Sequence, residues 1–347
     1  MHLKCDQLDL LEYIAPDCLM KKIILFLFVL FIAYSCRKTN SIQAPGQTDP
    51  IIHDTLNSWV KYLVKDSVTP LEDVWFINKN DGFTISNFQL FKTSDGGKTW
   101  LASLPTFYIS DNIQFLDSLH GFVQGNNIYT SIDGGITWTQ KNGGAGYGGV
   151  GIYFQFVTPD IGYYFAPGTG LYRTGDESNT WTSIFKPADY SNGRYPFYFL
   201  DSLTGFSLMN GNCYKTSSGG FNWDMVSAVT TLEFNGFYKM QFLDTLSGFC
   251  GANNELLKTT DGGKTWTTSF KVQEYDPNIH TFIIPQFFDA NNGYLMTSSG
   301  IYKTINGGKD WTTSCRIGKK NIYGIHFLDM NTGWACTSDG FVLALKQ

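Results

Sequence analysis

The sequence is poor in charge, and above all in arginine. Charged residues make up 16% of the 347 residues, and the formal net charge is −5. Arginine occurs at four positions, Arg37, Arg173, Arg194 and Arg316. Because nucleic-acid-binding surfaces need clustered lysine and arginine, this composition argues against a nucleic-acid partner.

Long apolar runs are also scarce, and the one clear example lies close to the N-terminus. It is "IILFLFVLFIA", from Ile23 to Ala33, and it follows Met20-Lys21-Lys22. A run of this length is too short for a stable membrane span, and a basic start followed by a short apolar run is typical of a secretory signal. We therefore expect residues 1–35 to be a signal peptide, with residues 1–19 upstream of the true start.

The residues that end this segment, "AYSC", resemble a bacterial lipobox, in which the cysteine is acylated and becomes the first mature residue. The resemblance implies a lipid on Cys36, export to the cell envelope and a membrane partner. Residues 36–55 are then expected to form a flexible polar tether. No acidic residue follows Cys36 directly, which by the sorting rules of such lipoproteins favours the outer membrane. The alternative is an ordinary cleaved signal peptide without a lipid.

Histidine and cysteine are too few and too scattered to predict a metal centre. The histidines beyond the signal show no ligand spacing, so we expect no metal and no cofactor; they are His53, His120, His280 and His326. The cysteines after Cys36 share no repeated register, and we expect them to be small buried apolar side chains rather than disulfide partners. They are Cys213, Cys250, Cys315 and Cys336.

Glycine, aromatic residues and repetition are what the sequence has in abundance. Glycine occurs 36 times and aromatic residues make up 16%, a profile typical of all-β, turn-rich proteins. One eight-residue box recurs six times, ending at Trp100, Trp138, Trp181, Trp223, Trp266 and Trp311. Its copies are "TSDGGKTW", "SIDGGITW", "TGDESNTW", "TSSGGFNW", "TTDGGKTW" and "TINGGKDW".

A second element, glycine followed by an aromatic residue, recurs seven times, at Gly82, Gly121, Gly162, Gly205, Gly248, Gly293 and Gly333. Successive copies are 39 to 45 residues apart, a period typical of propellers. Each period holds an apolar run ending in Asp or a substitute, the glycine-aromatic run, a third run, and a run that begins at the box Trp. Four short strands joined by tight turns form one propeller blade. The predicted fold class is therefore all-β, a seven-bladed β-propeller of four-stranded antiparallel blades over residues 56–347.

Seven glycine-aromatic units against six boxes predict how the ring closes. The last unit ends after its third run and lacks a fourth strand. The segment "SWVKYLV", from Ser58 to Val64, places Trp59 41 residues before Trp100, which matches the period. We therefore expect this N-terminal strand to complete the last blade, which hides sheet edges that would otherwise favour aggregation.

We interpret the box as a turn between the third and fourth strands rather than as a catalytic part. Its Asp can accept backbone N–H groups, its glycines can adopt positive φ, and its Trp can fill the gap between sheets. The substitutions Glu177, Ser178 and Ser218 favour this interpretation, because a turn tolerates them and catalysis would not. The residues assigned this structural role are Asp95, Trp100, Asp133, Trp138, Asp176, Trp181, Ser218, Trp223, Asp261, Trp266, Asn306 and Trp311.

The pattern S-x-D-G-G-x-T-W resembles the Asp-box, or bacterial neuraminidase, repeat. Combined with "FLD" and "GF" earlier in each unit, it is similar to the seven-bladed propellers of the photosystem II assembly-factor family. The resemblance covers about residues 56–347 and implies the propeller fold. It leaves the function open, because Asp-box propellers include sialidases, xyloglucanases, sortilin-type receptors and non-enzymatic assembly factors.

Sialidase activity is not expected, because sialidases resembling this fold bind a carboxylate with three arginines. Arg37 lies beside the lipid site, and Arg173 occupies the register that lysines hold in other units. A glycan-active hydrolase that uses acids in the links between blades remains the alternative function. Those acids are Asp111, Asp189, Glu233, Glu274 and Asp276, and they are otherwise interpreted as solvated loop residues.

The links between blades differ most in length and content, and variable loops on a rigid scaffold are where function usually lies. They carry aromatic and basic residues that are candidates for the mouth of the central channel, namely Tyr108, Arg194, Tyr195, Tyr238, Lys239, Phe282, Arg316 and Tyr323. Caps on the core where each first strand begins are the other interpretation of these rings. The sequence thus predicts an exported, lipid-anchored, non-catalytic binding or assembly module for a protein or glycan partner.

Overall fold

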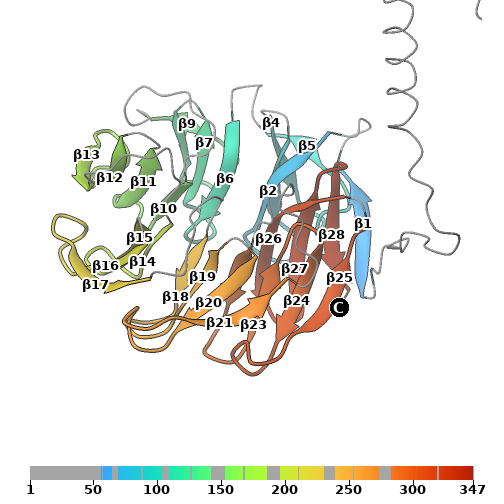
Figure 1. Cartoon of the computed structure of the whole chain (residues 1–347). Coiled ribbons are helices and arrows are strands. Elements are labelled where there is room, and N and C mark those ends of the chain that lie inside the picture. Colours follow the sequence, from blue (N-terminus) through green and yellow to red (C-terminus); the bar gives the residue numbers. More distant parts are fainter. Residues whose placement is uncertain are drawn as a thin grey trace, which may run out of the picture. The chain divides into compact units, whose positions relative to one another are not determined.

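A computed structural model describes residues 56, 58–64, 69–86, 89–103, 109–125, 127–141, 153–166, 169–185, 196–209, 211–229, 239–252, 254–272, 283–318 and 320–346. The strands form seven antiparallel sheets of four strands each, arranged in a ring (Figure 1). This confirms the predicted all-β, seven-bladed propeller. Within the described ranges, no helix is long and apolar enough to cross a membrane.

The first six blades each use four consecutive strands. Blade 1 holds β2 (Leu71–Phe76), β3 (Gly82–Ser86), β4 (Gln89–Thr93) and β5 (Leu101–Ala102). Blade 2 holds β6 (Ile109–Phe115), β7 (Gly121–Gly125), β8 (Ile128–Ser131) and β9 (Thr139–Gln140). Blade 3 holds β10 (Tyr153–Phe156), β11 (Gly162–Ala166), β12 (Gly170–Thr174) and β13 (Thr182–Phe185).

Blades 4 to 6 repeat the same order. Blade 4 holds β14 (Phe197–Phe199), β15 (Gly205–Met209), β16 (Asn212–Thr216) and β17 (Asp224–Ala228). Blade 5 holds β18 (Met240–Phe242), β19 (Gly248–Ala252), β20 (Glu255–Thr259) and β21 (Thr267–Lys271). Blade 6 holds β22 (Ile284–Phe287), β23 (Gly293–Met296), β24 (Gly300–Thr304) and β25 (Thr312–Arg316).

Blade 7 joins the two ends of the chain. Its inner strands are β26 (Ile322–Asp329), β27 (Thr332–Thr337) and β28 (Phe341–Leu345), and its fourth strand is the N-terminal β1 (Trp59–Leu63). Strand β1 pairs antiparallel with β28, and Trp59 lies opposite Leu345. This confirms that the N-terminal strand closes the ring.

The aromatic residue after each repeated glycine joins its blade to the next one. It stacks face to face on a Phe at or near the end of the first strand of the following blade, with centroid separations of 3.4 to 4.9 Å and interplanar angles of 3° to 19°. The seven pairs are Phe83–Phe115, Phe122–Phe156, Tyr163–Phe199, Phe206–Phe242, Phe249–Phe287, Tyr294–Phe327 and Trp334–Phe76. Such pairs contribute about 0.5–1.5 kcal/mol each beyond their buried area. The same kind of aromatic stack therefore stabilises every interface between blades.

A tryptophan also packs against each of these first-strand Phe rings. Each box Trp stands edge-on to the first-strand Phe of its own blade, as in Trp266 and Phe242, whose centroids are 6.1 Å apart at 88°. In blade 7 the same place is taken by Trp59, which lies 5.8 Å from Phe327 at 87°. Trp59 is 2% exposed, so the substitute for the missing box Trp is part of the core.

The repeated glycine is required by a close approach. At Gly205 a Cβ atom would lie 2.6 Å from the ring of Phe199, and the equivalent glycines face the equivalent Phe rings in all seven blades. A side chain there would displace the Phe from its stack. The glycine of each pair therefore makes room for the Phe ring of its own blade, and the aromatic residue after it stacks on the Phe of the next blade.

All six boxes form the turn between the third and fourth strands. In each, the backbone N–H at position five donates to the hydroxyl at position one, at 2.8 to 3.1 Å. The N–H at position seven donates to the side-chain oxygen at position three, at 2.8 to 3.0 Å. That oxygen comes from Ser218 or Asn306 where Asp is replaced, so the turn keeps its bonding when the residue changes.

The third box keeps this geometry without its glycines. Glu177 and Ser178 have φ of 57° and 67°, and no other non-glycine residue in the described ranges has positive φ. The corresponding Gly262 and Gly263 have φ of 75° and 86°. Side chains are strained in this region, so blade 3 bears a local cost that the other boxes avoid.

The four cysteines of the propeller are buried and form no disulfide; they are Cys213, Cys250, Cys315 and Cys336. This confirms the expectation that they act as small apolar core residues. Burial raises the pKa of the Cys213 thiol to about 12, which makes it a poor nucleophile.

A candidate binding site on the propeller axis

The first strand of every blade faces the propeller axis with alternate residues. The position directly before the first-strand Phe faces inward in all seven blades, and the position two residues earlier does so in blades 2, 3, 5 and 6. These positions contribute to a cavity of about 250 Å³ whose lining comes from all seven blades. Its lining includes Trp75, Gln114, Tyr153, Tyr198, Lys239 and His326.

Glutamine holds the position before the Phe in four blades, and these side chains bind to the next blade. Gln155 accepts the N–H of Phe199 at 2.9 Å and donates to its carbonyl at 2.8 Å. Gln114, Gln241 and Gln286 make the same pair of bonds to Phe156, Phe287 and Phe327. These glutamines therefore line the pocket and also connect each blade to the next through hydrogen bonds.

The other three blades carry a ring at this position, and these rings make the pocket aromatic. Trp75 and His326 meet across the seam between blades 1 and 7, with ring centroids 4.1 Å apart. Tyr198, from blade 4, follows Gln155 of blade 3 and precedes Gln241 of blade 5 in this set of positions. Aromatic rings in a confined polar pocket favour planar or apolar groups of a ligand.

His326 is held neutral in the pocket wall. Its Nδ1 accepts the backbone N–H of Phe76 at 3.2 Å, so its proton resides on Nε2. Burial, together with the positive charge of Lys239, lowers the pKa of His326 to about 3. The imidazole is therefore a hydrogen-bond donor at Nε2 throughout the physiological pH range.

Lys239 brings a positive charge to the axis. Its ammonium lies 5.8 Å from the centroid of the Tyr153 ring, and no carboxylate forms an ion pair with it in the part of the chain that the structure describes. Among the described residues that line the pocket there is no Asp or Glu. A half-buried cation with no ion-pair partner among the described residues is suited to bind an acidic group of a ligand.

Tyr153 is a protonated, partly buried phenol in the pocket wall. Burial, with Tyr198 and Asp73 nearby, raises the pKa of Tyr153 well above its usual value, so its hydroxyl stays protonated. Asp73 is 7% exposed and accepts the N–H groups of Val74 and Ile113, at 2.9 and 3.2 Å. Asp73 thus joins blade 1 to blade 2 through backbone hydrogen bonds.

The residues predicted from the sequence for the channel mouth fall into three groups. Lys239 lines the axial pocket. Tyr323 packs against the core cluster between blades 7 and 1, and Arg316 is exposed at the end of β25; neither lines the pocket. Tyr108, Arg194, Tyr195, Tyr238 and Phe282 lie outside the described residues, as do Cys36 and the side chains of the link acids Asp111, Asp189, Glu233, Glu274 and Asp276.

Sequence reasoning missed the pocket residues Trp75, Tyr153, Tyr198 and His326. A usable signal was present, because four of seven units have Gln directly before the first-strand Phe. Trp75, Tyr198 and His326 are the three departures from that rule. Tyr153 lies two residues before such a glutamine and carries no signal of its own.

The fold and this cavity define a seven-bladed β-propeller with an aromatic, singly cationic pocket on its axis. No family model and no curated protein matches the chain. Solved structures do resemble it. One of YCF48 bound to D1 peptide has a TM-score of 0.63 at 18% identity, covering 86% of this chain and 99% of that one.

Two further structures show the same likeness. YCF48 from Cyanidioschyzon merolae has a TM-score of 0.62 at 17% identity, covering 83% of this chain and 98% of its own. A catalytically inactive virginiamycin B lyase from Staphylococcus aureus, with quinupristin, has a TM-score of 0.63 at 11% identity, covering 83% and 99%. Because propellers of this kind include both a peptide-bound protein and a lyase, the likeness establishes the fold alone.

Proposed function

We propose that the chain is an exported, lipid-anchored Asp-box propeller that binds an acidic polypeptide segment in its axial pocket and catalyses no reaction. Lys239 is the observation that carries this proposal. Its ammonium faces the pocket beside Tyr153 and has no carboxylate partner among the described residues. A carboxylate of the bound segment would supply the missing charge.

The rings around Lys239 support a polypeptide ligand. Trp75, Tyr153 and Tyr198 offer flat apolar faces, and His326 offers a fixed donor at Nε2. A short segment with an acidic residue next to an apolar one would meet both features. The YCF48 structure with a D1 peptide supports this choice by analogy of fold.

Hydrolysis of a glycan requires two carboxylates facing the substrate. The described residues that line the axial pocket include no carboxylate, and the acids proposed for that role lie outside the described side chains. Binding of a glycan, or its hydrolysis, is therefore an outcome that the experiment must distinguish from polypeptide binding.

The test is capture from native membrane extracts with three forms of the chain. The wild type, Lys239→Met and Lys264→Met would be immobilised at equal loading, after equal melting temperatures have been verified. Lys264 is exposed in the fifth box, on the face opposite the links, and serves as the matched control. Wild type and Lys264→Met should capture the same protein, and Lys239→Met should capture roughly tenfold less, as expected when a charged hydrogen bond is lost.

Equal capture by all three forms would refute the proposal. Capture that disappears when the extract is deglycosylated would assign the site to a glycan. Conversion of that glycan by the wild type would assign a hydrolase.

A further inference from the structure

The tight turns of each blade lie on one face of the ring. The first turn joins strands one and two and the box joins strands three and four, so both lie at the same end of an antiparallel sheet. The amide of Gly134 in the second box donates to the carbonyl of Leu119 in the first turn of that blade, at 3.0 Å. We call this surface the box face. It consists of the boxes, 93–100, 131–138, 174–181, 216–223, 259–266 and 304–311, and the first turns, 77–81, 116–120, 157–161, 200–204, 243–247, 288–292 and 330–331.

Several turns of the box face carry large, exposed apolar side chains, although tight turns usually carry polar ones. The turns of blade 2 are the clearest case. Ile132 and Ile136 in its box are 74% and 72% exposed, and Leu119 in its first turn is 51% exposed. The exposed apolar residues in the turns of this face are Leu119, Ile132, Ile136, Leu203, Phe221, Leu246 and Ile305.

The fold does not require isoleucine at these box positions. The second box position is Thr260 in blade 5, and the sixth is Asn179 in blade 3. Both of those boxes keep the hydrogen bond from the seventh amide to the Asp side chain, at 2.9 and 2.8 Å. Ile132 and Ile136 therefore add apolar surface that the turn itself does not use, and such surface marks a contact with a partner.

The charges beside these side chains favour a surface that is not anionic. The two turns of blade 2 hold Asp117 and Asp133 and no lysine or arginine. Hydrogen bonds lower the pKa of both carboxyls to about 2, so both are ionised at neutral pH. Anionic lipids would be repelled here, whereas zwitterionic headgroups offer ammonium or choline groups that complement the carboxylates.

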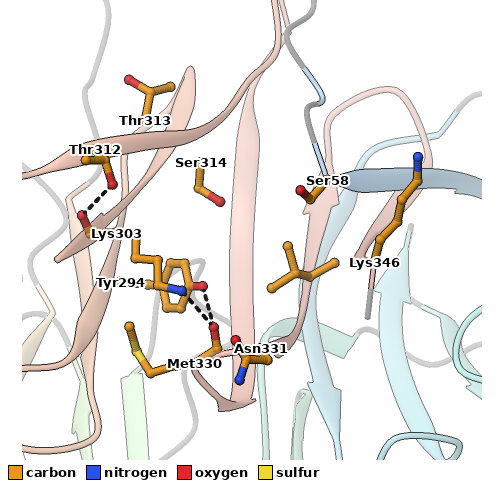
Figure 2. A pocket seen from close by; sticks show the side chains of 10 residues that line it. Ser58, Tyr294, Lys303, Thr312, Thr313, Ser314, Met330, Asn331 and Lys346 are labelled. Atoms are coloured by element: carbon orange, nitrogen blue, oxygen red, sulfur yellow. Dashed lines mark hydrogen bonds between the residues drawn. The ribbon is translucent and has the colours of Figure 1, made fainter. Parts of the chain in front are cut away.

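The chain also enters the propeller at the box face. Strand β1 begins at Trp59, in the place of a box Trp, and Ser58 precedes it. Figure 2 shows Ser58 and Asn331, which is in the first turn of blade 7, lining the same cavity. Cys36 precedes Ser58 by 22 residues in the sequence. A lipid on Cys36 would therefore be joined to the propeller through the box face.

We propose that the box face lies against the membrane surface, with Leu119, Ile132 and Ile136 inserted among zwitterionic headgroups. The inference rests on the proposed lipid anchor, which keeps this face close to the bilayer. Membrane binding by an acyl chain becomes more stable when a second contact accompanies it, and the apolar turns supply that contact. The links between blades then point away from the membrane and toward a partner.

The test measures the box face without the lipid. A chain that starts at residue 36 and carries Cys36→Ser keeps β1 to β28 and has no acylation site. It would be floated with vesicles of phosphatidylethanolamine and phosphatidylcholine, and binding is expected. Ile132→Thr/Ile136→Asn introduces residues that other boxes already hold at these positions. This double variant should lower the partition coefficient at least about tenfold, because it removes two inserted side chains.

Leu63→Thr is the matched control. Leu63 is 41% exposed and lies at the other end of β1, opposite Phe341, so its replacement should leave partitioning unchanged. Equal melting temperatures of all forms would be verified first. No binding up to about 5 mM lipid, or equal partitioning of the double variant and its parent, would overturn the proposal.

Two further outcomes would assign the box face differently and also overturn the proposal. One is binding that occurs only with anionic lipid. The other is a dimer that the double variant abolishes, without vesicle binding, which would assign the face to a second copy of the chain. The lipid anchor is tested separately, by acyl labelling of Cys36. Vesicle binding by a chain whose Cys36 is unlabelled in cells would refute the anchor and retain the membrane-binding face.

Discussion

The box residues of this propeller act through hydrogen bonds and backbone shape rather than through residue identity. Ser218 and Asn306 accept the same backbone N–H that Asp261 accepts, at 2.9, 3.0 and 2.9 Å. What the box cannot easily exchange is positive φ at its fourth and fifth positions, where Glu177 and Ser178 are forced into a region that favours glycine.

Glycine at position 177 should stabilise the protein. Glu177→Gly relieves a side chain at φ 57°, and the exposed ion pair with Lys141, at 3.3 Å, contributes little. We expect the free energy of unfolding in denaturant to rise by about 1 kcal/mol. Gly262→Ala, at the same position of blade 5, should lower it by a similar amount. Two changes of the same sign would contradict the strain argument.

The box carboxylates should make stability depend on pH in the acid range. Hydrogen bonds from the side chain and backbone of Thr137 lower the pKa of Asp133 from 3.8 to about 2, and those of Thr265 do the same for Asp261. Since the folded pKa lies below the unfolded one, the stabilisation is present above about pH 4 and is lost as the pH falls toward 2.

The double variant Asp133→Asn/Asp261→Asn should therefore flatten the fall of melting temperature between about pH 4 and 2, measured by calorimetry. Asp224→Asn, an exposed carboxylate on β17 outside the boxes, is the control. An unchanged slope in the double variant would show that these hydrogen bonds do not distinguish the folded from the unfolded state.

The sequence was sufficient for the features that repeat and insufficient for those that do not. Boxes and glycine-aromatic pairs predicted blade number, strand order and the closing strand, because each blade needs the same contacts. The axial pocket depends on Trp75, Tyr198 and His326, which replace a structural glutamine once each. Single departures from a repeat become visible only when the repeated role, two hydrogen bonds to the next blade, is known from coordinates.

At the scale of elements, β1 is the strand on which ring closure depends. It pairs with β28 along its length, and Trp59 takes the box Trp place against Phe327. The indole of Trp59 also donates to Ser314 of blade 6. Strand β1 therefore completes blade 7 and connects it to blade 6.

Deletion of residues 51–66 should open the last blade. It removes the buried Trp59 and exposes the edge of β28, so we expect a loss of more than about 3 kcal/mol and a tendency to self-associate. Melting temperature and light scattering measure both effects. Deletion of residues 37–50, which the sequence assigns to the tether, is the control. A 51–66 deletion that melts like the intact chain would refute closure by β1.

At the scale of the whole molecule, the proposed lipid anchor decides where the propeller works. The proposal rests on "AYSC" and predicts that Cys36 carries a fatty acyl chain. Metabolic labelling with an alkyne fatty acid should label the wild type in the membrane fraction, and Cys36→Ser should abolish the label. Cys213→Ser, at a buried core position, should retain it. An unlabelled, secreted wild type would instead indicate an ordinary signal peptide.

The meeting of the two chain ends in blade 7 has a consequence for how freely this chain can be rearranged. The backbone N–H of Lys346 donates to the carbonyl of Ser58 at 2.6 Å, so the start of β1 and the end of β28 are neighbours. A few added residues could join them, and new ends could be cut into any link between blades. Circular permutants with new ends in those links should therefore fold to the same seven-bladed ring.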